Sequence, residues 1–239
     1  FTASSDDSDA GEGTEISGDF TVSGGTFTHN SGKMTFDGGD ATINVNSVAN
    51  GTFYQLIFNP ATAGATKTVA DNDTLTVTNF LTLSQGNINQ ATVPAGGTID
   101  LQDDMTHGAG FDGGTGTLLI SGSATNEVPL TAAGQLPTVT LNNTNFTITG
   151  AATGTVTYDG LLTVTAGTVT LNAGANTLNG GLTVNGGTFT GSSGAVDVNG
   201  ALTLSSGTLT APSGSFTVSC IWAKSGGTFT SGSNTVTFD

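Results

Sequence analysis

The feature that most constrains the fold is a 20-residue repeat in the second half of the chain. Gly-Thr pairs recur at Gly167-Thr168, Gly187-Thr188, Gly207-Thr208 and Gly227-Thr228. A fixed period of this length is typical of repeat architectures in which each unit packs against its neighbours. Within each unit, apolar residues alternate with Thr, Ser or Asn. This period of two predicts strands with one buried face.

The repeat units align so that apolar residues of the same kind fall into rows. A parallel β-solenoid explains this, because each inward side chain then meets its counterpart in the next coil. An antiparallel sandwich is the alternative, since Asn-Gly pairs that favour hairpin turns also occur. The predicted rows are Leu162, Leu182, Leu202 and Trp222; Val164, Val184 and Leu204; Val169, Phe189, Leu209 and Phe229; Tyr158, Leu178, Val198, Val218 and Phe238; and Val156, Val196, Phe216 and Val236.

The first half of the chain has strand-like fragments at less regular spacing. We therefore expect one all-β solenoid domain over residues 19–239, with irregular coils over 39–150 and regular coils over 151–239. At about 20 residues per coil, this region holds roughly ten coils with little or no helix. Gly160, Gly180 and Gly200 recur at one predicted corner, where the bend needs a positive φ or leaves no space for a Cβ atom.

The composition limits the partners. The net charge is −15, and the only basic residues are Lys33, Lys67 and Lys224. Nucleic acid is therefore not an expected partner, because its binding needs clustered basic side chains. No apolar run is long enough to cross a bilayer, so membrane insertion is not expected either. Abundant Thr, Asn and Gly with little Lys and no Arg favours a bacterial protein that is extracellular or on the cell surface.

The first 18 residues differ from the rest. Six acidic residues lie between Asp6 and Asp19, among Ser and Gly. This composition predicts a flexible acidic arm over residues 1–18. A cation site and a strand that docks on a partner are the alternatives. The chain starts at Phe1, as a processed product would.

Three segments resemble a known repeat style. They are "FTVSGGTFTHNSGKMTFDG" (residues 20–38), "FYQLIFN" (residues 53–59) and "TLTVTNFLTLSQGNI" (residues 74–88). They resemble the repeats of large bacterial extracellular surface proteins, which follow the pattern "GTFTHNNGTVTFDG". The resemblance covers nearly all of residues 19–239. It implies a right-handed parallel β-solenoid with an adhesin-like or structural role.

The chain ends on the motif with which it begins. "SGGTFTHNSGKMTFD" (residues 23–37) and "SGGTFTSGSNTVTFD" (residues 225–239) are identical at ten of fifteen positions. A solenoid exposes apolar rows and unpaired strands at each end, and no helix that could cap either end is predicted. We therefore expect a structural subunit of an extracellular filament or surface fibre, in which the chain stacks head to tail on copies of itself. The residues predicted at the assembly ends are Phe20, Phe27, Met34, Phe36, Trp222, Lys224, Phe229, Val236 and Phe238. A segment of a longer tandem chain is the alternative.

One stretch could carry chemistry, "DLQDDMTHGAGFD" (residues 100–112). It places His107 among acidic residues, as polysaccharide-degrading solenoids do, but it has no basic residue nearby to bind an anionic sugar. We therefore expect no enzymatic activity and no catalytic residue. No cofactor is expected, although carboxylates suit calcium. The weak calcium candidates are Asp100, Asp103, Asp104 and Asp112.

Two further features suggest surfaces. Cys220 is the only cysteine and could form an intermolecular disulfide. A T-x-T pattern recurs on strands predicted to lie side by side and resembles the arrays of ice-binding solenoids, although Thr also favours exposed strand positions generally. Ice binding and adhesion to a surface polysaccharide are therefore alternative functions. The T-x-T residues are Thr168, Thr170, Thr188, Thr190, Thr208, Thr210, Thr228 and Thr230.

Overall fold

The computed structural model describes residues 2–4, 13–46, 51–91, 96–122, 127–130, 133–150 and 154–239. Every regular element in these ranges is a β-strand, and every strand pairing in them is parallel. The strands form a β-solenoid of about ten turns, which follow one another about 21 residues apart. This confirms the predicted fold class, whereas its right-handed sense stays a prediction.

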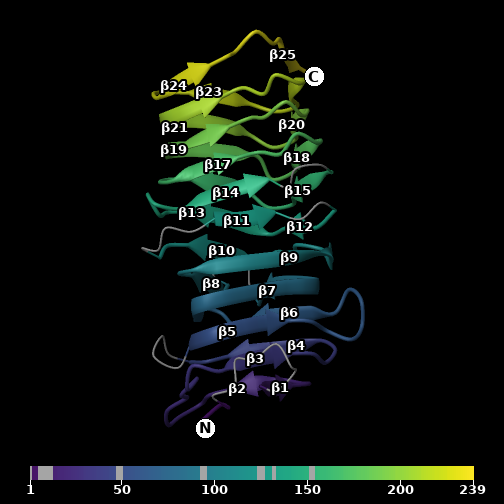
Figure 1. Cartoon of the computed structure of the whole chain (residues 1–239), viewed down its shortest axis with the longest axis vertical. Helices are drawn as coiled ribbons and strands as arrows, with labels where there is room; N and C mark the ends of the chain where they lie inside the picture. The colour runs from purple at the N-terminus through teal and green to yellow at the C-terminus, as the bar shows by residue number, and fades with distance from the viewer. Residues whose placement is uncertain are drawn as a thin grey trace. The chain divides into compact units, whose positions relative to one another are not determined.

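The chain divides into two compact units, residues 1–122 and residues 123–239. We call them unit 1 and unit 2 and describe each by itself. In both units the chain runs through three strand positions in each coil, which we call the first, second and third faces in chain order (Figure 1). The predicted single domain over residues 19–239 stays a prediction.

Unit 1 has coils of unequal length. The first face joins β5, β7, β8 and β10, and the second joins β1, β3, β5, β7 and β9. The third face joins β2, β4, β6 and the end of β7. The strands are β1 (Thr14–Ile16), β2 (Phe20–Thr21), β3 (Lys33–Phe36), β4 (Ala41–Asn44), β5 (Thr52–Phe58), β6 (Thr66–Val69), β7 (Thr74–Gln90), β8 (Thr98–Leu101), β9 (Asp104–Phe111) and β10 (Thr117–Ile120).

Unit 2 has the regular coils. Its first face joins β13, β16, β19, β21 and β23, its second β11, β14, β17, β19, β21 and β24, and its third β12, β15, β18, β20, β22 and β25. The strands are β11 (Glu127–Leu130), β12 (Gln135–Leu136), β13 (Thr138–Leu141), β14 (Thr147–Gly150), β15 (Val156–Tyr158), β16 (Leu162–Val164), β17 (Thr168–Thr170), β18 (Asn176–Leu178), β19 (Leu182–Thr190), β20 (Val196–Val198), β21 (Leu202–Thr210), β22 (Phe216–Val218), β23 (Trp222–Lys224), β24 (Thr228–Thr230) and β25 (Val236–Phe238).

The predicted apolar rows form the core of unit 2. Leu162 pairs in register with Leu182, and Leu182 pairs with Leu202. The side chains of all three are fully buried. Asn176 interrupts another row, between Val156 and Val196. Its buried amide Nδ2 donates a hydrogen bond to the carbonyl oxygen of Gly174 at 2.9 Å, so this donor is partnered within its own turn, whereas the buried Oδ1 has no hydrogen-bond partner among the described residues.

The glycine corner has a steric cause. None of Gly160, Gly180 and Gly200 has a positive φ. A Cβ atom on Gly180 would lie 2.3 Å from the carbonyl carbon of Gly160, and one on Gly200 would lie 2.5 Å from that of Gly180. These distances are far shorter than any van der Waals contact. The corner is therefore glycine because successive coils approach too closely for a side chain.

The predicted acidic arm is only partly described, since residue 1 and residues 5–12 lie outside the described ranges. In its described part, β1 pairs with β3, and Thr2 forms an isolated bridge with Thr28. Backbone at both ends of the predicted arm therefore takes part in the pairing of unit 1.

A charge placed within an apolar row should destabilise unit 2. Val184 is fully buried between Val164 and Leu204. We expect Val184→Asp to lower the free energy of unfolding by about 3 kcal/mol or more, because it removes buried apolar area and buries an unpaired carboxylate. The matched control is Thr183→Asp, whose side chain points outward on the same strand and should change stability by less than about 0.5 kcal/mol. Urea unfolding followed by circular dichroism measures both, and equal midpoints for the two variants would contradict the row assignment.

Candidate functional site

The last coil of unit 2 is paired on one side only. β23 and β24 pair with β21, and β25 pairs with β22. No other described strand pairs with these three. Their outer edges therefore present unpaired backbone donors and acceptors, which can be extended by a further strand.

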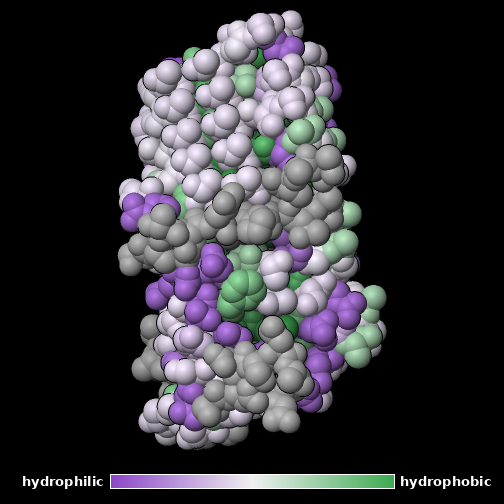
Figure 2. All heavy atoms as spheres, viewed as in Figure 1, coloured by the Kyte–Doolittle hydropathy of each residue, from purple (hydrophilic) through white to green (hydrophobic). Residues whose placement is uncertain are grey.

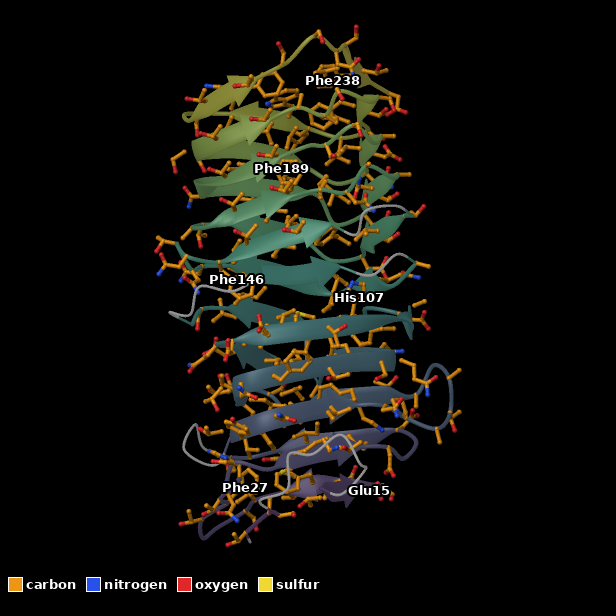
Figure 3. All side chains as sticks on the ribbon, viewed as in Figure 1. Glu15, Phe27, His107, Phe146, Phe189 and Phe238 are labelled. Carbon is orange, nitrogen blue, oxygen red and sulfur yellow. The ribbon has the colours of Figure 1, made fainter. Side chains whose placement is uncertain are left out.

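The same coil exposes its apolar row members. The exposed fraction of Phe238 is 61%, whereas that of Val218, one coil earlier in the same row, is 1%. Ile221 is also exposed, at 67%, but it occupies the outward corner position that Ala201, itself exposed, has one coil earlier. The alternation of inward and outward residues is unchanged, so the exposure of Phe238 follows from the lack of a covering strand among the described residues. Figure 3 shows Phe238 at this uncovered end of unit 2.

Aromatic contacts hold the last coil together. The ring centroid of Trp222 lies 4.8 Å from that of Phe229 in an edge-to-face arrangement and 5.7 Å from that of Phe238. Trp222 also contacts Phe216 of the preceding coil, with ring centroids 6.2 Å apart. Aromatic pairs of this geometry add to the stability that burial supplies. The uncovered end is thus a preformed aromatic surface, which we call the C-terminal surface: Ile221, Trp222, Phe229, Val236 and Phe238.

The other predicted assembly end is covered by the chain itself. Phe20, Phe27, Met34 and Phe36 are all at least nine-tenths buried. Met34 and Phe36 lie between Thr14 and Ile16 of β1 on one side and Leu56 and Phe58 of β5 on the other. The backbone N–H of Ala3 donates to the carbonyl oxygen of Thr28, 2.9 Å away. The first coil of unit 1 is therefore made of Thr2–Ser4, β1 and β2, which precede most of the predicted residues.

The sequence carried a weak signal for this first coil. In residues 14–22, Ile16, Phe20 and Val22 are separated by polar residues and by one Ser-Gly pair. That spacing fits strands with inward apolar residues. The density of acidic residues favoured a flexible arm over residues 1–18 instead, so strand β1 was missed, whereas β2 lies within the predicted solenoid domain.

A partly open hollow of about 340 Å³ lies at this first coil. Ile16, Phe20 and Val22 line it with apolar atoms, and Asp19 and Thr21 contribute polar ones. The carboxylate of Asp19 accepts a hydrogen bond of 2.7 Å from the backbone N–H of Thr42, so its position is fixed by the next coil. We call this hollow the N-terminal groove.

The T-x-T residues lie on the second face of unit 2. Thr168, Thr188, Thr208 and Thr228 form one in-register ladder, and their partners two residues later form a second. The pair Thr147 and Thr149 on β14 extends both ladders by one coil. We call this array the Thr surface. The side of unit 2 seen in Figure 2 is covered mainly by residues of nearly neutral hydropathy, in keeping with its Thr, Ser and Gly content.

The acidic candidates do not gather into a metal site. Within the described residues, which include all four candidate aspartates, no three His, Cys, Asp or Glu side chains are placed to hold a metal ion. Asp100 instead accepts hydrogen bonds from Ser121 at 2.5 Å and from Gln102 at 3.4 Å. Burial raises the pKa of Asp104, and the neighbouring Asp103 raises it further. Asp112 is exposed beyond the end of β9.

The side chain of His107 points into the core and not toward these carboxylates. It pairs with Leu83 on the second face of unit 1, and its side chain is 1% exposed. Asp100 lies on the first face, with a half-buried side chain. Burial holds the pKa of His107 below its usual value of 6.5, although the backbone at Gly108 acts in the opposite direction. The histidine is thus a core residue of unit 1.

Lys67 is a buried cation that sequence reasoning did not single out. It pairs with Ala41 and Ile88 on the third face, and its exposed fraction is 1%. Its ammonium group donates to the carbonyl oxygen of Gly38 at 2.8 Å and to that of Gly39. Charge-assisted hydrogen bonds of this kind are stronger than neutral ones. Lys67 therefore fastens the turn that follows β3 to the core.

Cys220 is an exposed free thiol next to Ile221 of the C-terminal surface. In the part of the chain that the structure describes, there is no helix of the length and apolar character needed to cross a bilayer.

These features define the class of the protein as a parallel β-solenoid with an uncovered apolar end. No protein-family model matches the chain, and no curated protein or solved structure is significantly similar to it.

The stability of unit 1 should fall as the pH falls below 6.5. The folded chain holds the pKa of His107 below 6.5, so as the pH falls the unfolded chain binds the proton at a higher pH than the folded chain does. Protonation therefore stabilises the unfolded state relative to the folded state. We expect the urea midpoint of the protein to decrease between pH 7.5 and pH 5.5, and His107→Leu, which matches its neighbour Leu83, to reduce that decrease. His29→Gln is the control, because the His29 ring stacks on Tyr54 with centroids 6.1 Å apart, away from the core rows. A pH dependence that is unchanged in His107→Leu would exclude His107 as its source.

Proposed function

We propose that the protein is a structural subunit of an extracellular filament or surface fibre, which grows as copies stack coil on coil. The observation that carries the proposal is the C-terminal surface, where the apolar rows of unit 2 end without cover. The partner is the protein itself, and the role is structural rather than catalytic. The extracellular location rests on the composition.

The physical reason is that one coil recognises the next by the same contacts throughout unit 2. Each interior coil contributes strand edges on three faces and inward apolar residues to its neighbour. The last coil offers both kinds of contact without a neighbour in the described structure. Exposed apolar patches and open strand edges are features that mark association sites. A contact between two different ends does not close on itself, so it generates an open filament.

Removal of the exposed ring of Phe238 should prevent assembly. We expect the parent chain to form filaments that are visible by negative-stain microscopy, and Phe238→Ser to leave monomers in size-exclusion chromatography with light scattering. The variant would lose roughly 1.5–3 kcal/mol of burial at every junction.

Leu161→Ser is the matched control for this experiment. Leu161 is also a large exposed apolar residue, with an exposed fraction of 36%, but it lies at an interior corner of unit 2. The control should assemble like the parent. A parent chain that stays monomeric at high concentration would refute the proposal, and a Leu161→Ser variant that also fails to assemble would show that association occurs along the side.

The Thr surface supports a second candidate function, ice binding. Its hydroxyl and methyl groups repeat at about 4.8 Å between coils and about 6.6 Å along each strand. The pairs lie in register on five strands, so the grid is regular in both directions. Such a grid can hold water molecules in an ordered layer, and ice is the ligand that presents one.

A bulky residue within the Thr surface tests this candidate. We expect Thr208→Tyr to abolish the inhibition of ice recrystallisation, because the ring stands above the flat grid. Thr203→Tyr lies on the same strand but on the first face, where it should leave that activity unchanged. An inactive parent chain would exclude ice binding, and equal loss in both variants would exclude the Thr surface as its site.

A further inference from the structure

We infer that Asn185 is a site of spontaneous deamidation, a reaction that converts its side-chain amide into a carboxylate. The site is the corner of unit 2 where β19 passes from the first face to the second face, two coils before the last one. This inference goes beyond the proposed function and does not depend on it. It follows from the sequence at Asn185, from the hydrogen bonds of its amide and from the backbone next to it.

Unit 2 contains three Asn-Gly pairs. They are Asn179-Gly180, Asn185-Gly186 and Asn199-Gly200. In deamidation the backbone nitrogen of the following residue attacks the side-chain carbonyl carbon of Asn, and a glycine leaves that approach unhindered because it has no Cβ atom. Each pair is followed by Gly or Ala, so the three pairs should have similar reactivity in an unfolded chain. The fold then decides how they differ.

The side-chain carbonyl of Asn185 receives two hydrogen bonds. Its Oδ1 accepts from the Oγ hydroxyls of Ser205 and Ser206 in the next coil, both at 3.2 Å. This oxygen gains negative charge when the backbone nitrogen attacks, so donors already aimed at it stabilise the tetrahedral intermediate. Within the described residues, no hydrogen bond holds Nδ2, the atom that leaves as ammonia. Asn185 is exposed, so water and base reach it.

The attacking nitrogen belongs to Gly186, which lies outside the regular pairing. On the side of the preceding coil, β19 is in register over residues 182–184 and 188–190. On the side of the following coil, the register passes from Asn185 to Thr188. Gly186 is exposed and has a φ of 133°, in the region that favours glycine. Backbone outside the paired segments is less restrained, so it can bring the nitrogen of Gly186 to Cγ of Asn185.

The other two Asn-Gly pairs are held in a ladder of side chains. Nδ2 of Asn179 donates to Oδ1 of Asp159 at 3.0 Å, and Nδ2 of Asn199 donates to Oδ1 of Asn179 at 2.9 Å. In both residues the ladder therefore fixes the atom that must leave. The carboxylate of Asp159 also opposes the negative charge that would develop on the amide of Asn179. In the folded protein, Asn185 should react faster than either of them.

The reaction is balanced without an oxidant, a reductant or an enzyme. Base removes the N–H proton of Gly186, and the nitrogen forms a bond to Cγ of Asn185. The bond between Cγ and Nδ2 then breaks, and ammonia leaves with a proton from water, which regenerates the base. A second water molecule opens the resulting succinimide at either carbonyl, which gives an aspartyl or an isoaspartyl residue.

The product changes this corner in charge and in length. It adds one negative charge to a chain whose net charge is −15. The isoaspartyl form also lengthens the main chain by one carbon atom, at a point where the register between β19 and β21 is already shifted. The hydroxyls of Ser205 and Ser206 can donate to the new carboxylate as they do to the amide oxygen. Unit 2 should therefore keep its apolar rows after the modification.

Peptide mass mapping of aged protein tests the inference. The full chain is incubated in mildly alkaline buffer, once folded and once in urea, and the deamidated fraction of each Asn-Gly pair is followed with time. In urea the three pairs should react at similar rates. In the folded protein Asn185 should react about fivefold faster than Asn179 and Asn199, or more, which corresponds to the free energy of about one hydrogen bond. Chromatography of the peptides should resolve both the aspartyl and the isoaspartyl products.

Serine variants separate activation by the two hydroxyls from mere exposure of the amide. Ser205→Ala with Ser206→Ala should slow the reaction at Asn185 about fivefold or more, because the developing negative charge loses its donors. The rates at Asn179 and Asn199 should not change. Ser219→Ala is the matched control, because the Ser219 hydroxyl donates to Asp239 and not to an amide. This control should leave the rate at Asn185 unchanged.

Two results would overturn the inference. One is a reaction at Asn179 or Asn199 that is as fast in the folded protein as the reaction at Asn185. The other is an unchanged rate at Asn185 in a double serine variant that urea unfolding shows to be folded. If the double variant unfolds, its rates at Asn179 and Asn199 rise to their values in urea. The single variants Ser205→Ala and Ser206→Ala then decide, since at least one of them must slow the reaction at Asn185.

Discussion

The whole structure depends on the parallel, in-register contact between one coil and the next. Each coil leaves half of its strand hydrogen bonds and most of its apolar side chains unsatisfied until another coil covers it. In unit 2 this requirement is met by near-identical neighbours, so that Leu lies on Leu and Thr lies on Thr at a fixed spacing. The glycine corner shows how close the contact is, since a single Cβ atom would collide with the coil before it. A core built in this way is uniform along its length, but the stacking contacts by themselves leave one side of each terminal coil uncovered.

The two terminal coils deal with this constraint differently. In unit 1, Thr2–Ser4, β1 and β2 lie over the aromatic cluster, and Phe20 and Phe27 are buried with ring centroids 5.4 Å apart. Among the described residues of unit 2, no strand covers the aromatic cluster around Trp222 in this way, and Phe238 is mostly exposed. One end therefore presents short polar strands around a groove, and the other presents rings and free strand edges. For the assembly proposed above, this asymmetry favours a contact between unlike ends over one between like ends.

Some inward positions in the two units carry polar side chains in place of apolar ones. Asn176 and Lys67 occupy inward positions that neighbouring coils fill with apolar residues. Asn176 donates to a backbone carbonyl of its own turn, and Lys67 donates to backbone carbonyls of the preceding coil. His107 takes an inward position next to Leu83 without joining the acidic residues that surround it in the sequence. Sequence reasoning grouped His107 with those residues because they are close along the chain. Alternation sends neighbours along a strand to opposite sides, so closeness in the sequence did not become closeness in space.

The sequence by itself determined the strand class, the 20-residue period and the rows of unit 2. Alternation and repetition are local properties, and they leave one arrangement in which Leu162, Leu182 and Leu202 can all be buried. It also placed the T-x-T pairs on one surface, because residues at a fixed period fall on the same face. Only the tertiary structure decided which coil ends are covered. The burial of Met34 and Phe36 depends on β1, a three-residue strand whose own sequence is too short and too acidic to predict pairing. Such pairing depends on long-range contacts, which no local pattern encodes.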